Sequence, residues 1–214
     1  LNTMAKSFTV EKNFRRATMT KTLNYYNQCA EAYNETTLNI EFDSKREMLL
    51  KYLQPNAHIL DLGCGSGRDS KGFLQKGYKV TAVDGSKELC KIASKNIGQD
   101  VICQLFNELD AVNEFDGVWA CASLLHLPTN ELKQTLKRVE KALKKDGYFY
   151  ASFKYGDFEG ERDGRYFNDF TEVSFSTLLK EFPNLELQEV EVTTDVIPGR
   201  ENVSWLNVIM KKID

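Results

Sequence analysis

One short segment of the chain combines an acid with bare backbone. In Asp61-Leu62-Gly63-Cys64-Gly65-Ser66-Gly67-Arg68, the acid lies near the end of an apolar run and three alternating glycines follow it. Without Cβ atoms, such a turn can adopt unusual backbone angles, and a ligand can lie directly against the main chain. A second acid, Asp84, ends the next apolar run, where a carboxylate can accept both hydroxyls of a ribose. The pattern predicts a nucleoside-binding turn.

Two kinds of nucleotide suit a glycine-rich turn, and the spacing distinguishes between them. A dinucleotide-binding turn follows G-x-G-x-x-G, which needs a glycine at position 68, where the chain has Arg68. Its pyrophosphate uses the free N–H groups of a helix start. S-adenosylmethionine has no phosphate and offers a sulfonium, an ammonium and a carboxylate, which suit an acid before the turn and a base after it. We therefore predict S-adenosylmethionine, with a plain strand-to-helix turn as the alternative.

The chain resembles the class I S-adenosylmethionine-dependent methyltransferases, and within them the tellurite-resistance-like and small-molecule branch. The resemblance runs from about residue 25 to residue 212 and is carried by four stretches: Tyr25–Tyr33, Asp61–Ser70, Val83–Ser86 and Phe115–Ala120. It implies S-adenosyl-L-methionine as the methyl donor and S-adenosyl-L-homocysteine as the product. It also implies that the segments after each strand hold the donor.

Helical and strand patterns alternate along the chain, which is typical of parallel βαβ units. The predicted helices are Tyr25–Tyr33, Ser44–Leu53, Asp69–Lys76, Ser86–Asn96, Thr129–Lys145 and Thr171–Phe182. The predicted strands are His58–Leu62, Lys79–Asp84, Asp100–Cys103, Phe115–Cys121, Tyr148–Lys154, Leu185–Thr194 and Val203–Lys211. The last two are joined by a segment too short for a parallel crossover, so they should pair antiparallel.

These elements predict an α/β fold. It is a Rossmann-like, seven-stranded methyltransferase sandwich, a mostly parallel sheet with an antiparallel C-terminal hairpin. We expect one methyltransferase domain over residues 1–214. Within it, residues 1–20 would be a flexible extension, residues 21–54 helices that cover the cofactor site, and residues 55–214 the catalytic core.

Composition narrows the class of protein. The formal net charge of −3 gives no broad basic field for nucleic acid, and no apolar run is long enough to span a membrane. The first residues carry no signal-peptide pattern. Five cysteines without close pairing predict reduced, buried thiols and a cytoplasmic protein. The two histidines and scattered acids show no metal-ligand spacing, so we expect no metal.

Specific roles follow for the predicted cofactor site. Asp61 would meet the ammonium group, and Arg68 would reach the carboxylate unless it is a solvated first-turn residue. After the third strand, the acid usual in the family is absent, which puts an adenine contact at Leu105 in doubt. Phe106, through its backbone amide, and Asn107 remain candidates, with core packing as the alternative for Phe106. The predicted cofactor-binding set is Tyr26, Asp61, Gly63, Cys64, Gly65, Gly67, Arg68, Asp84, Gly85, Ser86, Phe106, Asn107, Cys121 and Ala122.

The acceptor side is predicted from groups after the fourth and fifth strands. His126 is the candidate general base, because imidazole titrates near neutrality; capping or packing is its alternative role. The loop of residues 154–167 would shape the acceptor site, or else be solvated with its charges paired internally. The predicted substrate residues, which favour an anionic acceptor with apolar walls, are Lys154, Arg162, Arg165, Tyr166 and Trp205, with Arg200 as a further cation.

The expected function is methyl transfer to a small-molecule acceptor by in-line displacement. Positioning and desolvation would supply most of the catalysis. Tyr26 and Tyr33 would form part of a lid over the cofactor, with core packing as the competing role. The alternatives are a methyltransferase acting on tRNA or protein and a non-catalytic S-adenosylmethionine-binding regulator. We expect a monomer or homodimer that binds neither nucleic acid nor membrane.

Overall fold

A seven-stranded sheet forms the centre of the protein in the order β3-β2-β1-β4-β5-β9-β8. The computed structural model describes the backbone of residues 2–214 and the side chains of residues 20–214. The strands of this sheet are β1 His58–Leu62, β2 Lys79–Asp84, β3 Ile102–Cys103, β4 Phe115–Ala120, β5 Leu143–Lys154, β8 Leu185–Thr194 and β9 Ser204–Lys212. β1 to β5 pair in parallel, whereas β9 pairs antiparallel with both β5 and β8. The predicted fold class is confirmed.

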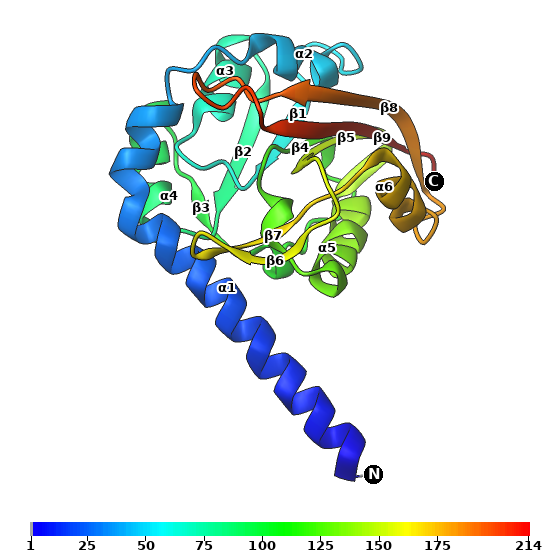
Figure 1. Cartoon of the computed structure of the whole chain (residues 1–214). Helices are drawn as coiled ribbons and strands as arrows, with labels where there is room; N and C mark the ends of the chain where they lie inside the picture. Colours follow the sequence, from blue (N-terminus) through cyan, green and yellow to red (C-terminus); the bar gives the residue numbers. More distant parts are fainter. Residues whose placement is uncertain (1) are drawn as a thin grey trace.

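Helices cover both faces of this sheet (Figure 1). The α-helices are α1 Asn2–Thr37, α2 Asp43–Leu50, α3 Arg68–Gln75, α4 Lys87–Ile97, α5 Thr129–Ala142 and α6 Glu172–Leu179, and two short 3-10 turns are η1 Phe106–Glu108 and η2 Leu124–His126. Ser86 caps α4 as predicted, because its hydroxyl accepts a hydrogen bond from the Leu89 amide. None of these helices combines the length and apolarity that a membrane crossing requires in the described part of the chain.

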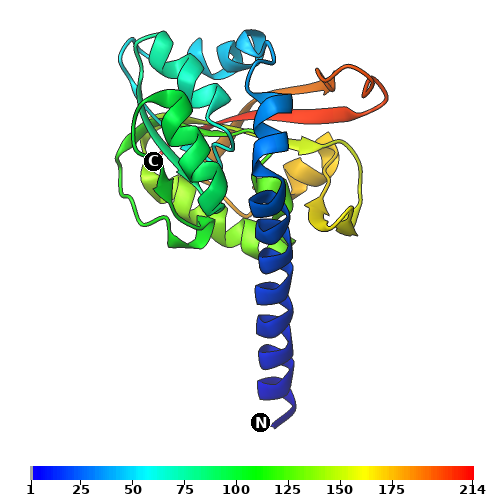
Figure 2. The same ribbon diagram turned by 90° about the vertical axis from the view of Figure 1, so that its left-hand side faces the viewer.

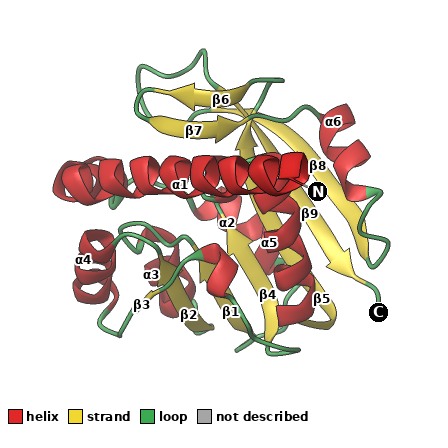
Figure 3. Cartoon of the chain, turned by 90° about the horizontal axis from the view of Figure 1, so that it is seen from below, coloured by secondary structure: helices red, strands yellow, loops and turns green. Residues whose placement is uncertain are grey.

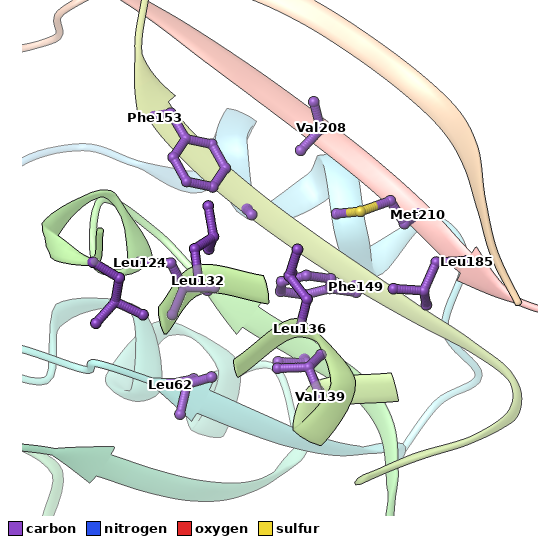
Figure 4. Close-up of a cluster of buried hydrophobic side chains, with 14 of the residues drawn as sticks. Leu62, Leu124, Leu132, Leu136, Val139, Phe149, Phe153, Leu185, Val208 and Met210 are labelled. Carbon is purple, nitrogen blue, oxygen red and sulfur yellow. The ribbon is translucent and has the colours of Figure 1, made fainter. Parts of the chain in front are cut away.

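The main core lies between the sheet and the face covered by α5 and α6. Leu132, Leu136 and Val139 project from α5 toward Phe149 of β5, and all four are fully buried (Figure 4). Their i, i+4, i+7 spacing gives α5 one apolar stripe, which is why this segment forms a helix against a sheet. Burial of these side chains fixes the sheet edge that carries the site.

A second core on the opposite face supports the turn after β1. Trp119 of β4 is fully buried and stacks on Tyr150 with ring centroids 3.9 Å apart. Its indole N–H donates to Asp69 Oδ2 of α3 at 3.0 Å. Buried indole groups need such a partner. This contact ties the start of α3, and with it the glycine turn, to the centre of the sheet.

α1 is a single helix of 36 residues rather than the short segment predicted around residues 25–33. Its amino-terminal part projects beyond the rest of the domain (Figures 1 and 2), and its later turns pack against α4 and β7. In Figure 3, α1 runs between α4 and the β6–β7 hairpin. The expected division at residue 20 falls inside this helix, and the side chains before it lie outside the described residues. That division stays a prediction.

Two other expectations about elements were wrong. The segment after β5 was expected to be a loop, but β6 Glu159–Arg162 and β7 Arg165–Asn168 form an antiparallel hairpin. The fifth helix was expected to reach Lys145, but α5 ends at Ala142 because Leu143 already has extended backbone and pairs with Phe115 in the sheet.

The five cysteines are all free, as predicted. Cys64 and Cys90 are buried, and Cys29 and Cys121 are half-buried. Cys103 is exposed, so the expectation that all the thiols are buried was wrong. Cys103 lies on the short edge strand β3, and no further strand covers it in the sheet.

Candidate active site

The candidate site lies at the carboxyl ends of β1, β2 and β4. The strand order reverses between β1 and β4, and open α/β sheets bind ligands at such a switch point. The turns after these strands, together with α1, enclose a cavity of about 730 Å³ including its open mouth.

Bare backbone forms the floor of this first cavity. Gly63 has a φ of +86°, and a Cβ there would lie 2.4 Å from the Cβ of Ser123. A Cβ on Gly65 would lie 3.1 Å from the ring of Tyr33, with a φ of +57°. Positive φ angles and this crowding both require glycine. The turn therefore presents main chain rather than side chains to whatever occupies the cavity.

Asp84 ends β2 and faces the same cavity. Its carboxylate accepts hydrogen bonds from the backbone N–H groups of Gly65 at 2.9 Å and Ser86 at 2.8 Å. Burial raises its pKa to about 6, although these hydrogen bonds act in the opposite direction. Each carboxylate oxygen keeps acceptor capacity beyond its single amide bond. Asp84 is thus a fixed acceptor of the kind that a pair of ribose hydroxyls requires.

The remaining wall of the first cavity is mostly apolar. Leu89, Leu105 and Phe106 line it, and Gln104 adds a polar side chain. Among the described residues that line this cavity there is no lysine or arginine. A pyrophosphate would therefore meet a carboxylate without a compensating cation. An uncharged, planar nucleobase could pack against this apolar wall while its ribose lies near Asp84.

Tyr26 and His126 form a hydrogen-bonded pair at the edge of the first cavity. His126 Nδ1 lies 2.7 Å from the carbonyl oxygen of Tyr166, which can only accept, so Nδ1 carries the proton. Nε2 therefore accepts from the Tyr26 hydroxyl at 2.8 Å. Burial lowers the pKa of His126 to about 4, and Arg165 and Lys154 act in the same direction. The imidazole is neutral and has a defined tautomer.

A second, larger cavity adjoins the first. It has a volume of about 1400 Å³ with its open mouth and shares with the first cavity Tyr26, Tyr33, Cys121, Ala122 and His126. Its described charged residues are Lys45, Arg68, Lys154, Arg165, Arg200 and Asp195. A cavity lined by cations thus shares a boundary with a cavity that holds a carboxylate and no described lysine or arginine. Two ligands of opposite charge could meet at this boundary.

Known families match the part of the chain that builds this site. A methyltransferase-domain family matches residues 59–147, from β1 into β5. The provisionally named methyltransferase YqeM of Bacillus subtilis is 31% identical over 140 residues, which cover 60% of this chain and 57% of that protein. The malonyl-[acyl-carrier protein] O-methyltransferase of Priestia megaterium is 26% identical over 145 residues, 65% of this chain and 52% of that protein. The chain spans about half the length of the curated relatives it matches.

Solved structures share the whole architecture. The 1,6-didemethyltoxoflavin-N1-methyltransferase of Burkholderia thailandensis, solved with 1,6-didemethyltoxoflavin and S-adenosylhomocysteine, superposes with a TM-score of 0.71. The two chains are 24% identical, and the match covers 89% of this chain and 85% of that one. Residues 59–147 thus match a methyltransferase domain, and the chain as a whole has the fold of the S-adenosylmethionine-dependent methyltransferases.

The structure brings most of the predicted cofactor residues to the first cavity. Those that line it are Tyr26, Gly63, Gly65, Asp84, Gly85, Ser86, Phe106, Cys121 and Ala122. Those that do not line it are Asp61, Cys64, Gly67, Arg68 and Asn107. The first group keeps its predicted roles as proposals. The residues of the second group make other contacts, which differ from one residue to the next.

Asp61 points away from the first cavity because strand side chains alternate between faces. Leu60 and Leu62 of β1 pack toward α5, so Asp61 faces α3, where its carboxylate accepts from the Ser70 hydroxyl at 2.6 Å. Burial, and then the neighbouring Asp69, raise its pKa to about 7. Asp61 thus supports the turn through Ser70, and its predicted contact with an ammonium group stays a prediction.

Arg68 lines the second cavity rather than the first. It forms a bidentate ion pair with Asp69, with distances of 3.0 and 2.7 Å, and its guanidinium lies 3.8 Å over the ring of Phe42. Asp69 also accepts from Arg46 at 2.8 Å. These partners hold Arg68 beside Cys121, at the boundary between the cavities. Its predicted contact with the donor carboxylate stays a prediction.

The other three residues have local roles. Gly67 is the N-cap of α3, and a Cβ there would lie 2.9 Å from Ile97, so this glycine allows α3 to pack on α4. The Cys64 side chain is buried against α4 and the sheet. Asn107 lies within the exposed turn η1, outside the lining of either cavity.

The predicted acceptor residues divide in the same way. Lys154, Arg165 and Trp205 line the second cavity. Arg162 does not, and it pairs instead with Asp169 at 3.1 Å. The Tyr166 hydroxyl donates to Glu159 at 3.0 Å, so Tyr166 contributes its backbone carbonyl to His126 rather than an apolar wall.

Sequence reasoning missed part of the first cavity that α1 supplies. Thr22 and Leu23 line it, and a Cβ on Gly85 would lie 2.8 Å from Leu23. Tyr26 and Tyr33 had predicted that this helix covers the cofactor site. Thr22 lies one helical turn before Tyr26 on the same face of the helix. That spacing was the signal by which Thr22 could have been found.

Proposed function

We propose that this protein is an S-adenosylmethionine-dependent methyltransferase that methylates a small, anionic acceptor. One observation carries the proposal. A cavity that holds Asp84 but no described lysine or arginine shares a boundary with a cavity rich in cations. The first suits a cationic nucleoside, and the second suits an acid.

The residues of the first cavity fit the methyl donor in chemistry. Asp84 would accept the ribose hydroxyls, and Leu89, Leu105 and Phe106 would surround the adenine. The turn at Gly63 and Gly65 would lie against the amino-acid part of the donor. When bound, S-adenosylmethionine supplies a sulfonium methyl that can be displaced in line.

The shared boundary would hold the reacting groups of donor and acceptor together. Tyr26, Cys121, Ala122 and His126 line both cavities. The neutral Nε2 of His126 can take a proton that the Tyr26 hydroxyl passes on from an acceptor hydroxyl or amine. Cys121 serves only as lining, because burial raises its thiol pKa to about 12 and keeps it protonated.

Other features support a small-molecule enzyme of the cytoplasm. The Burkholderia thailandensis relative was solved with 1,6-didemethyltoxoflavin bound. All five cysteines are free, which fits a reducing compartment. A monomer or homodimer without metal remains the simplest proposal for the active form.

The experiment uses S-adenosylmethionine with a labelled methyl group and a pool of acidic small molecules. We expect label in an acidic small molecule, and we expect Asp84→Ala to weaken S-adenosylhomocysteine binding by about 1.5–3 kcal/mol, because a charged hydrogen bond is lost. The matched control is Lys71→Ala on the exposed face of α3, which should leave both readouts unchanged.

Two outcomes of this experiment would contradict the proposal. Label found in tRNA or protein, and not in small molecules, would place the chain among macromolecular methyltransferases. Tight S-adenosylhomocysteine binding without transfer to any acceptor class would indicate a regulator that has lost the reaction.

A further inference from the structure

Three cations surround one aromatic ring beside the second cavity. The charged groups of Arg162, Arg165 and Lys154 lie 4.5, 5.0 and 5.3 Å from the centroid of Phe167. Phe167 is buried on β7, and three different strands deliver the charges: Lys154 ends β5, Arg162 ends β6 and Arg165 begins β7. Like charges at this spacing repel one another, and burial increases that cost. An arrangement of this kind needs negative charge nearby.

The described side chains supply only part of that negative charge. Asp169 accepts both hydrogen bonds from Arg162, each at 3.1 Å. Within the described part of the chain, no carboxylate forms an ion pair with Arg165 or Lys154. Lys154 has the carboxylate of Asp169 in its neighbourhood, which acts to raise its pKa, but neither Lys154 nor Arg165 forms an ion pair with a described residue on the cavity wall.

Arg165 is the group most clearly held ready for a ligand. Its guanidinium lies 4.4 Å over the ring of Tyr25 and 5.0 Å from that of Phe167, so aromatic faces fix its position. Its Nε is buried and has no hydrogen-bond partner among the described residues. Because Nε is closed off, a ligand in the second cavity, which Arg165 lines, would accept from the terminal nitrogens of the guanidinium. The second cavity is where such a ligand can lie.

Lys154 and Arg200 extend the cationic wall. Burial and the nearby Arg162 lower the pKa of Lys154, which is the effect expected of an ammonium group that faces other cations. Arg200 lines the same cavity from the β8–β9 connection. The carboxylate of Asp195 accepts hydrogen bonds from the Trp205 indole at 3.1 Å and the Ile197 amide at 2.9 Å. Neither of these two donors is a cation of the wall.

The cationic wall lies close to the reacting boundary. The Arg165 guanidinium is 5.9 Å from the centroid of the Tyr26 ring, and Tyr26 lines both cavities. A ligand group bound at Arg165 is thus only a few bonds away from a group beside Tyr26 and His126. The acceptor must be compact, with its anion near its nucleophile.

We propose that Lys154 and Arg165 bind a group with two negative charges on the acceptor, either a phosphate monoester or a dicarboxylate. This inference rests on the proposed function, because only a methyltransferase has a methyl acceptor. Arginine forms paired hydrogen bonds to carboxylate and phosphate alike, while lysine adds a point charge. Two cations that form no ion pair with a described residue match two negative charges better than one.

The first experiment measures binding of simple anions to the full chain by calorimetry at constant ionic strength. Inorganic phosphate and malonate are the dianionic probes, and acetate is the monoanionic one. We expect one dianionic probe to bind at least about tenfold more tightly than acetate. Preference for phosphate indicates a phosphorylated acceptor, and preference for malonate a dicarboxylic one. Equal affinities for acetate and both dianions overturn the proposal.

The second experiment uses charge-removing variants with matched controls. Arg165→Gln and Lys154→Gln should each weaken binding of the preferred dianion at least about tenfold, and Arg165→Lys should retain part of it. Lys71→Gln removes the same charge on the exposed face of α3 and should bind as the unmodified chain does. Variants that fold, by circular dichroism, yet bind the dianion unchanged overturn the proposal.

S-adenosylhomocysteine binding separates this inference from the proposed function. If S-adenosylhomocysteine binds and the dianions do not, the inference fails alone. If a dianion binds through Arg165 and S-adenosylhomocysteine does not bind, the proposed function fails, and the anion site stands by itself. We expect both to bind, with S-adenosylhomocysteine affinity unchanged in Arg165→Gln.

Discussion

At the scale of single residues, two acids that look alike in the sequence have different roles. Asp84 is the last residue of its strand, and its carboxylate faces the first cavity, as predicted. Asp61 lies one residue before the end of β1, and strand alternation turns it toward Ser70. Sequence spacing could locate both acids at the right edge of the sheet. It could not tell which carboxylate lines the first cavity, because that depends on which face of the sheet α3 covers.

The Tyr26–His126 pair leads to a prediction about proton transfer. His126→Gln should lower turnover by about 10²–10⁴-fold, because a neutral imidazole beside the acceptor is lost as general base. S-adenosylhomocysteine affinity should change by less than about threefold, which is under 1 kcal/mol. Steady-state kinetics and calorimetry on the same preparation check both values.

Tyr26→Phe serves as the companion variant. It keeps the ring but removes the hydroxyl that donates to His126 Nε2, so turnover should fall while the ring contact with Tyr33 remains. Equal losses of turnover and of S-adenosylhomocysteine affinity in both variants would show that the pair shapes the donor site and does not act on the acceptor.

At the scale of elements, local patterns predicted the strands well and the β6–β7 hairpin poorly. The hairpin turn is Asp163-Gly164, with φ values of +53° and +76°, between the paired residues Arg162 and Arg165. An Asp-Gly pair of this kind is a known signal for a two-residue hairpin turn. The signal was in the sequence, but the flanking strands are too short and too charged to show an alternating pattern.

The glycine turn allows a test at the same scale. Gly63→Ala should destabilise the fold by about 2–4 kcal/mol, because positive φ and a crowded Cβ both cost free energy. Its Cβ would lie 2.4 Å from Ser123. Gly77→Ala is the matched control, since its φ of +85° is nearly the same but no atom lies within 4 Å of the added Cβ.

The control isolates backbone strain from crowding. Gly77→Ala should cost only about 1–2 kcal/mol, the usual penalty for a left-handed non-glycine residue. Urea denaturation of the three proteins measures the difference. A Gly63 variant no less stable than the Gly77 variant would show that the turn can move away from Ser123, contrary to a rigid cradle.

At the scale of the whole molecule, the proposed function depends on the division of charge between two cavities. The seven-stranded sheet and its switch point could be predicted, because alternating elements and the short 195–202 connection determine the strand directions. The cover that α1 provides could be predicted only in outline, since its packing between α4 and β7 joins residues far apart in the chain, such as Asn27 and Ser86, 59 positions apart. The cationic cavity likewise depends on which charges pair, and Arg162 with Asp169 does so while Arg165 does not.

The most direct test of the account is a calorimetric titration with S-adenosylhomocysteine and with NADH, at pH 7.5 and at pH 5. We expect the protein to bind one S-adenosylhomocysteine and no NADH at pH 7.5. Affinity should fall at pH 5, because the Asp84 carboxylate has a pKa of about 6 and is protonated below it, whereas Asp84→Asn should bind weakly at both pH values. Binding of NADH in place of S-adenosylhomocysteine would contradict this interpretation. So would an S-adenosylhomocysteine affinity that is the same at both pH values and in Asp84→Asn.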